Sequence, residues 1–444
     1  MNKVSDTLVI SYFFPPSGYV SGITVSKRII NNNQIVDVLQ ADYDNEQDNK
    51  FNECLDEFIN QRYLIDIDGN FDHADFIFKF VDEGSRYFKN DYSRIFSRSW
   101  LMANHFLAFE YKLKNNSIFW SAEFSDPLIY NLSNKRKNYK QMIIDDEEYI
   151  DKINQEISKS YPDLDLIENK SSAYFIAEYL VYLFADKIIF TNENQRETMI
   201  NQFPVDVYDI VIEKSEIQAH PTLPDKYYHI IESKLKLEND CINIAYFGSD
   251  YYGKRHFESM FYAMESLNHK YKDKIRFYIF INDVQLVKNL ISTLSVKQNI
   301  IVKKPLEYLE FLNLTTKFDV LVVNDVITKG NYDINPYLPS KLSDYIGSDS
   351  DIWAICEQGS VLSKMDVKYK SYIDDFNSVA LELVRILENN GFADEDYYFE
   401  EDYLLQRLTS LNELYEKEFR KNLTLKKELK KVKRKKKRFS RWLK

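Results

Sequence analysis

The sequence predicts an α/β protein made of two domains, each built around a mostly parallel sheet. Short β-like runs alternate with helical stretches over most of the 444 residues, and this alternation is typical of parallel sheets covered by helices. The alternation occurs twice, on either side of a polar segment at 206–240. A chain of this length also has room for two or three domains. We therefore expect two sheets that face each other across a cleft.

The first series opens with a strand expected over 7–14. A turn with Gly18 and Gly22 and then a helical pattern follow this strand, in the order of elements that begins a Rossmann-like unit. The other strands are expected at 74–80, 92–96, 117–122 and 187–191, and the main helices at 100–114 and 171–184. We assign the first domain to 1–205 and the polar segment 206–240 to a linker.

The second series begins at Ile242 and repeats the alternation. Its short apolar strands read INIAYFG, KIRFYIFI, NIIVKKP, FDVLVVND and DIWAICE, and helical segments follow most of them. We assign this domain to 241–375 and expect the helices of 376–403 to pack back on the first domain. Ligands of open parallel sheets bind at the carboxyl ends of the strands. The loop residues expected there are Gly248, Asn324, Asp325 and Glu357.

The end of the chain, 404–444, has a different pattern from both domains. It begins with an apolar helical stripe formed by Leu404, Leu408, Leu411, Tyr415 and Phe419. The segment 420–444 then holds 14 Lys or Arg residues and one acid, whereas the rest of the chain holds 44 basic and 68 acidic residues. A basic helix that ends near Trp442 suits an anionic membrane surface. A coiled coil that joins subunits and a solvated tail are the alternatives.

Composition excludes several classes of function. The acidic body argues against nucleic acid as the main partner. Three distant cysteines, Cys54, Cys241 and Cys356, indicate neither a disulfide framework nor a zinc site. No apolar run approaches the roughly 18 residues of a membrane-spanning helix, and the first residues do not read as a signal peptide. We expect a cytoplasmic protein that lies on the inner face of the membrane through 420–444.

Five sequence motifs lie at the ends of the expected strands. Tyr12-Phe13-Phe14-Pro15-Pro16 precedes Gly18 and Gly22, and Trp120-Ser-Ala-Glu123-Phe-Ser-Asp126-Pro127 ends a later strand. Ala185-Asp186-Lys-Ile-Ile-Phe-Thr191 closes the first series, and Tyr246-Phe247-Gly248 with Lys254-Arg255 opens the second. Pro339-Ser-Lys341-Leu-Ser-Asp344-Tyr345 is followed by Gly347. In this order the motifs resemble those of bacterial GT-B glycosyltransferases classed with family 4.

The resemblance implies two Rossmann-like domains with a nucleotide-sugar donor between them, and retaining transfer without a metal ion. The implied donor-binding residues are Gly248, Lys254, Arg255, Lys341, Asp344 and Gly359. The implied acceptor-binding residues are Gly18, Gly22 and Glu123, and the implied catalytic residues are Asp126 and His105. Family 4 often carries two glutamates at this helix. Asp344 matches the second, whereas Pro336 stands where the first is expected.

The donor-side residues suit a nucleotide diphosphate. Arg255 has the planar fork that can hold two phosphate oxygens, and Lys341 would add a point charge. Asp344 can accept hydrogen bonds from ribose hydroxyls. The alternatives are that the cations are solvated, that Asp344 pairs with Lys341 three residues earlier, and that Gly359 only forms a turn.

The acceptor-side residues have two interpretations each. Glu123 and Asp126 can supply acid–base chemistry, although in a retaining mechanism the leaving phosphate itself can take the acceptor proton. Asp126 can also cap the following helix, and His105 can be a buried helical histidine. No cluster of ligands has metal spacing, and the nucleotide-sugar is a substrate, so no cofactor is expected.

The sequence therefore predicts a glycosyltransferase at the cytoplasmic membrane face. Its acceptor would be a glycan or a lipid-linked glycan, in the synthesis of a surface polysaccharide. A nucleotide-sugar epimerase on the same fold and a non-catalytic binding or scaffold protein are the alternatives. A homo-oligomer through the C-terminal helix is a further expectation.

Overall fold

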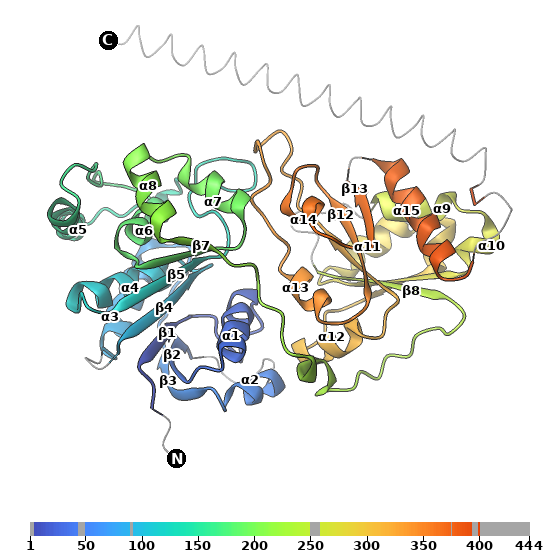
Figure 1. Cartoon of the computed structure of the whole chain (residues 1–444), viewed down its shortest axis with the longest axis horizontal. Coiled ribbons are helices and arrows are strands. Elements are labelled where there is room, and N and C mark those ends of the chain that lie inside the picture. The colour runs from blue at the N-terminus through green and yellow to red at the C-terminus, as the bar shows by residue number, and fades with distance from the viewer. Residues whose placement is uncertain are drawn as a thin grey trace, which may run out of the picture.

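The computed structural model describes residues 4–42, 49–88, 92–248, 258–373, 375–392 and 398–399. These residues form two α/β domains that lie side by side (Figure 1). The tail at 404–444 lies outside the described residues, as do Lys254 and Arg255. Within the described ranges, no helix is both long and apolar enough to cross a membrane.

The first domain is built on a seven-stranded parallel sheet with the order β3-β2-β1-β4-β5-β6-β7. Its strands are β1 (Thr7–Ile10), β2 (Val36–Ala41), β3 (Ile59–Ile65), β4 (Arg94–Ser99), β5 (Phe119–Phe124), β6 (Lys187–Phe190) and β7 (Ser215–Ile217). The chain moves outward from β1 to β3 and then returns to place β4 on the other side of β1. This reversal is a topological switch point at the carboxyl ends of β1 and β4, the place where ligands of open parallel sheets bind.

Helices cover both faces of the first sheet. They are α1 (Val20–Asn32), α2 (Asn49–Leu55), α3 (Ala74–Ser85), α4 (Ala103–Lys114), α5 (Glu147–Ser160), α6 (Ala173–Phe184), α7 (Glu193–Ile200) and α8 (Val205–Lys214), with the 3₁₀ helix η1 (Lys140–Met142). Successive strand residues point to opposite faces. Leu8 and Ile10 of β1 therefore join the core under α3, α4 and α6, whereas Val9 packs with α1 and α2.

The second domain is built on a six-stranded parallel sheet with the order β10-β9-β8-β11-β12-β13. Its strands are β8 (Ile242–Phe247), β9 (Ile275–Phe280), β10 (Ile300–Lys303), β11 (Val320–Asn324), β12 (Asp351–Cys356) and β13 (Tyr369–Tyr372). The order reverses between β8 and β11, which places the second switch point at the carboxyl ends of these two strands.

The helices of the second domain include one from 376–403, the segment that we expected to pack on the first domain. They are η2 (Asp225–His229), α9 (Glu258–Ser266), α10 (His269–Lys272), α11 (Val284–Ile291), η3 (Ser295–Asn299), α12 (Tyr308–Thr315), α13 (Lys341–Ile346), α14 (Val361–Lys364) and α15 (Phe376–Asn389). In the described part of 376–403, α15 buries Val379, Leu383 and Ile386 in the core of the second sheet. The short connection after β13 returns α15 to its own sheet rather than to the first domain.

The core on the α1 and α2 face continues across the domain boundary. Val25 of α1 and Phe51 of α2 belong to the same buried cluster as Phe247 and Tyr308 of the second domain. The rings of Phe51 and Tyr308 meet edge to face with centroids 4.8 Å apart. Continuous apolar packing therefore joins the domains beside the linker.

The structure confirms the strands expected at 92–96, 117–122 and 187–191 and all five strands of the second series, with shifts of a few residues. The strand expected at 74–80 is wrong, because this segment begins α3. Phe76, Ile77 and Phe80 are buried at helical spacing, and a short apolar run does not by itself distinguish strand from helix. The first sheet also extends to β7, so 206–217 of the expected linker belongs to the first domain.

Candidate active site

Gly248 stands at the switch point of the second sheet, directly after β8. Its N–H donates to the carbonyl oxygen of Phe280 at 3.1 Å. A Cβ atom at this position would lie 2.6 Å from the hydroxyl of Tyr246, whose side chain is buried. A larger residue would therefore displace the buried Tyr246 ring, whereas glycine leaves that ring in place.

Asn324 ends β11 in register with Gly248, because Val322 pairs with Tyr246. Asn324 is 1% exposed, and among the described residues neither the nitrogen nor the oxygen of its side-chain amide has a hydrogen-bond partner. An unsatisfied buried polar group costs roughly 1–3 kcal/mol, so it calls for a functional explanation. The second switch point thus presents an unused donor and acceptor where ligands of such sheets bind.

Asp325 and Glu357 lie at the same strand ends but hold loops in place. The Glu357 N–H donates to Asp325 Oδ2 at 2.9 Å. The Glu357 carboxylate in turn accepts from the Thr328 N–H at 2.7 Å and from Asn335 Nδ2 at 3.2 Å. These contacts fasten the loop that connects β11 to α13.

Asp344 is buried in α13 and is paired across the domain boundary. Its Oδ1 accepts from Lys27 Nζ of α1 at 2.8 Å and from the Tyr308 hydroxyl at 2.7 Å. Lys27 Nζ also donates to Ser343 Oγ at 2.8 Å. The partner of Asp344 is therefore Lys27 of the first domain and not Lys341, which was the alternative from the sequence.

Lys341 begins α13 and places its ammonium 4.5 Å from the centroid of the Phe311 ring. Gly359 lies in the turn after β12 with φ +83, and an added Cβ would meet nothing within 4 Å. Its backbone conformation therefore requires glycine, as the turn interpretation states. Pro336, in the place of the expected glutamate, accepts a hydrogen bond from Asn192 Nδ2 at 3.1 Å through its carbonyl oxygen.

Gly18 and Gly22 lie between β1 and the body of α1. Gly18 is exposed in the loop, whereas Gly22 is buried inside α1. A Cβ at Gly22 would lie 1.8 Å from the carbonyl oxygen of Phe13. Gly22 therefore lets α1 approach the loop after β1, and this close approach sets the position of the first switch point.

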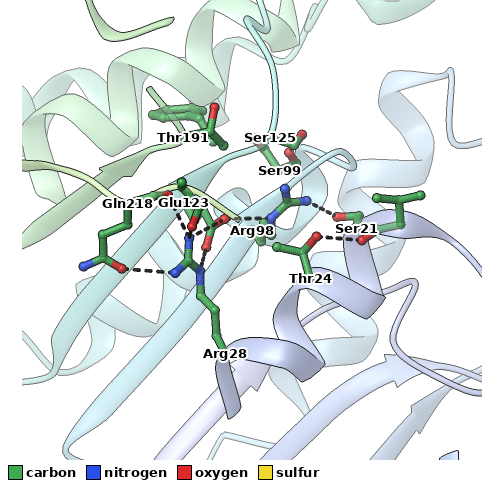
Figure 2. A network of polar contacts seen from close by, with 12 residues as sticks. Ser21, Thr24, Arg28, Arg98, Ser99, Glu123, Ser125, Thr191 and Gln218 are labelled. Carbon is green, nitrogen blue, oxygen red and sulfur yellow. Dashed lines mark hydrogen bonds and ion pairs between the residues drawn. The ribbon is translucent and has the colours of Figure 1, made fainter. Parts of the chain in front are cut away.

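Glu123, at the end of β5, is the centre of a buried ion network (Figure 2). Its carboxylate accepts from Arg28 Nη2 at 3.1 Å and from Arg98 Nε at 3.0 Å, and the carboxylate is fully buried. Burial alone would raise the pKa of Glu123, but Arg28 and Arg98 outweigh this effect and hold the pKa below its ordinary value. Arg28 also binds the carbonyl oxygen of Gln218 in the linker at 3.1 Å.

His105 lies under this network, fully buried in α4. Its Nδ1 is 2.8 Å from Ser97 Oγ, and its Nε2 has no partner within the described ranges. Burial, with Arg98 nearby, lowers the pKa of His105 to about 3. The imidazole is therefore neutral at pH 7 and a poor proton acceptor, although it can still donate or accept a hydrogen bond.

Asp126 lies two residues beyond β5 and is half-buried. The expectation that it caps the following helix is wrong, because α5 begins at Glu147 and is capped by Asp146, whose side chain accepts from the Tyr149 N–H. The chain between Asp126 and α5 contains only the short helix η1.

His220 is a site candidate that the sequence did not single out, since it stands in the predicted linker. Its Nδ1 is buried and has no partner in the described part of the chain, and burial together with Arg98 lowers the pKa of His220 to about 3. His220 lines a cavity of about 240 Å³ between the domains, together with Asn194 of α7, Ser343 of α13 and Lys364 of α14. Only the three-dimensional return of the linker to the cleft reveals this position.

Among the described residues, no three His, Cys, Asp or Glu side chains gather as a metal site. Lys254 and Arg255 lie outside these residues, so their expected contact with phosphate stays a prediction.

Comparison with known proteins shows similarity of structure without similarity of sequence. Neither a protein-family model nor a curated protein sequence matches the chain. The structure is similar to Anabaena HepE in complex with UDP-glucose, with a TM-score of 0.53, 10% identity, and coverage of 86% of this chain and 90% of HepE. It is also similar to the apo structure of OtsA, with a TM-score of 0.54, 12% identity, and coverage of 86% and 91%.

A third similar structure belongs to a protein described as a UDP-N-acetylglucosamine 2-epimerase from Listeria monocytogenes. The TM-score is 0.50 at 9% identity, with coverage of 93% of this chain and 96% of that protein. At such identities, similarity establishes architecture rather than activity. The two parallel sheets, each with a switch point, and these structural relatives together show that the chain has the GT-B fold.

Proposed function

We propose that this chain transfers a sugar from a nucleotide-sugar, most simply a UDP-hexose, to an acceptor bound between the domains. The observation that carries the proposal is Asn324, whose buried side-chain amide has no partner among the described residues and lies in register with Gly248 at the second switch point. A nucleotide-sugar supplies both donors and acceptors for such an amide. The UDP-glucose complex of HepE, which shares the fold, supports this choice of ligand.

The remaining donor contacts follow from the sequence predictions. Lys254, Arg255 and Lys341 would stabilise the diphosphate as it leaves, which is the main electrostatic demand of the reaction. Asp344 would accept from the ribose hydroxyls. Because Asp344 Oδ1 already accepts from Lys27, donor binding would require the carboxylate to be shared with Lys27 or released by it.

Within the described network, no side chain is a suitable base to accept the proton of the acceptor hydroxyl. Glu123 is neutralised by two arginines, and the low pKa of His105 makes its imidazole a weak base. We therefore propose that the leaving phosphate oxygen takes the proton of the acceptor hydroxyl. The bond from the sugar carbon to phosphate breaks as the bond to the acceptor oxygen forms, on the same face of the ring. This is retaining, metal-independent transfer, and Asp126 would orient the acceptor.

The location of the reaction is proposed from charge. The basic segment 420–444 would hold the enzyme on the cytoplasmic face of a membrane, where a lipid-linked glycan of a surface polysaccharide is a suitable acceptor. Removing 420–444 should abolish sedimentation with phosphatidylserine vesicles and leave hydrolysis of the donor unchanged. Sedimentation that persists would contradict the tether.

Asn324→Ala tests the donor site, and Asn299→Ala is its matched control. Asn299 is also buried in the second domain, but its amide nitrogen donates to the carbonyl oxygen of Lys272 at 2.8 Å. Asn324→Ala should weaken UDP-glucose binding by about tenfold or more and leave the melting temperature nearly unchanged. Asn299→Ala should lower the melting temperature and leave binding unchanged. Equal affinities of wild type and Asn324→Ala in calorimetry would refute the assignment.

An epimerase is the alternative that one comparison favours, since the Listeria protein has the same fold. The two activities differ in product, because transfer releases UDP whereas epimerisation changes the sugar still attached to UDP. Chromatography of a UDP-sugar incubation separates the two outcomes. Binding without any turnover would indicate the non-catalytic alternative.

A further inference from the structure

Four aromatic rings gather at the first switch point, outside the carboxyl ends of β1 and β4. They belong to Phe13 and Tyr19 of the loop after β1, Phe71 before α3, and Trp100 directly after β4. Phe13 lies 4.4 Å from Tyr19 and 5.0 Å from Trp100 between ring centroids. Phe71 lies 5.6 Å from Trp100. We call these four residues the aromatic platform.

The platform is built on a buried ring and presents two exposed ones. Phe13 is 5% exposed, whereas Tyr19 and Trp100 are 45% and 42% exposed. The Tyr19 and Trp100 rings lie 5.7 Å apart between centroids, tilted by 42°. Exposing large apolar rings to water is unfavourable, and adjacent exposed rings usually mark a binding surface.

The platform is held rigidly by polar contacts beneath it. Arg98 Nη1, two residues before Trp100, donates to Ser21 Oγ, two residues after Tyr19, at 2.8 Å. Asn104 joins the same segments, because its Nδ2 donates to the Arg98 carbonyl oxygen at 2.9 Å and its Oδ1 accepts from the Tyr12 N–H at 3.2 Å. The segments that carry the two exposed rings are therefore tied together without a ligand, and such preorganisation lowers the entropy cost of binding.

We infer that the platform binds a pyranose ring of the acceptor, with Tyr19 and Trp100 against the C–H face of the sugar. This inference rests on the proposed function and adds that the part of the acceptor bound by the enzyme is a pyranose. A pyranose has an apolar face of C–H groups and a rim of hydroxyls. Burying that face against the rings removes apolar area from water, while the Tyr19 hydroxyl and the Trp100 indole N–H meet the rim.

Two features favour a sugar over a lipid chain as the occupant. The platform stands at the switch point, where small ligands of parallel sheets bind. The exposed rings are the two that carry polar edges, and the plain phenyl ring of Phe13 is the buried one.

The test uses octyl β-glucoside, which carries a pyranose and an alkyl chain in one molecule, below its micelle concentration and with UDP present. Saturation-transfer NMR should show transfer from the wild-type protein to the ring C–H protons rather than to the octyl chain. Trp100→Ala should reduce this transfer and weaken binding by roughly tenfold, whereas Trp100→Tyr should retain most of it. Phe119→Ala is the matched control, since Phe119 is 44% exposed but begins β5 at the opposite end of the sheet.

The outcomes separate this inference from the proposed function. Transfer mainly to the octyl protons, or equal transfer from wild type, Trp100→Ala and Phe119→Ala, would overturn the sugar platform. UDP affinity measured by calorimetry should be the same in wild type and Trp100→Ala, because the nucleotide binds the other domain. A wild-type protein that binds no nucleotide would instead overturn the proposed function.

Discussion

The buried pair between Lys27 of α1 and Asp344 of α13 predicts a large effect for Lys27→Met. The change keeps most of the side-chain volume but removes the donor that lies 2.8 Å from Asp344 Oδ1. The side chains are only 3% and 9% exposed, so the carboxylate would remain buried with the Tyr308 hydroxyl as its remaining described donor. Breaking a buried pair from one side costs about 3–5 kcal/mol. We expect a loss of this size in the free energy of unfolding.

A double-mutant cycle with Lys27→Met and Asp344→Asn measures the pair itself. Urea unfolding of the four proteins should give a coupling of about 1–3 kcal/mol. Lys50→Met is the control, because Lys50 and Glu53 form a pair in the same domain that is 58% and 60% exposed, and its loss should stay below about 0.5 kcal/mol. X-ray scattering would detect any opening of the cleft. A loss in Lys27→Met no greater than that in Lys50→Met, with an unchanged radius of gyration, would refute the reasoning.

Two further predictions concern the first domain. Burial raises the pKa of the Glu178 carboxyl from an ordinary 4.5 to about 7, so the folded protein favours the protonated form. The free energy of unfolding should therefore fall by on the order of 3 kcal/mol as the pH rises from about 4 to 7. Glu178→Gln should flatten this dependence in urea titrations, and a slope equal to the wild type would contradict it. Gly22→Ala would place a methyl group 1.8 Å from the Phe13 carbonyl oxygen. It should therefore lower the melting temperature more than Gly359→Ala, whose added methyl group has space and adds only backbone strain of about 1–2 kcal/mol. A larger loss of melting temperature in Gly359→Ala would contradict this prediction.

The fold was largely predictable because strand burial leaves a strong pattern. The strands of the second series, such as β8 and β11, are apolar on both faces, as expected for parallel strands covered by helices. Neither β2 nor β3 is among the expected strands. β3 lies at the sheet edge, where Asn60 and Gln61 are exposed and interrupt the apolar pattern. β2 is buried throughout, but the polar residues Asp37 and Gln40 interrupt its apolar run. The segment at 74–80 was misassigned because aromatic residues at helical spacing also suit a strand.

The candidate site was predictable in its strand ends but not in its partners. Gly248 and Asn324 lie at the expected switch point, because topology places strand ends together. The pairing of Asp344 with Lys27, 317 positions away, depends on how the two domains meet, and no local pattern encodes that contact. The same holds for His220, which approaches Arg98 only because the linker returns to the cleft.

The apolar cluster shared by α1, α2 and the second domain limits how the chain can be divided. Its members include Val25, Phe51 and Tyr308, so cutting the protein at the linker would expose a core face on each fragment. Neither half should be soluble alone, and chimeras between relatives should keep α1 and α2 with the second domain that they contact. The boundary for recombination therefore follows the packing of side chains and not the covalent linker.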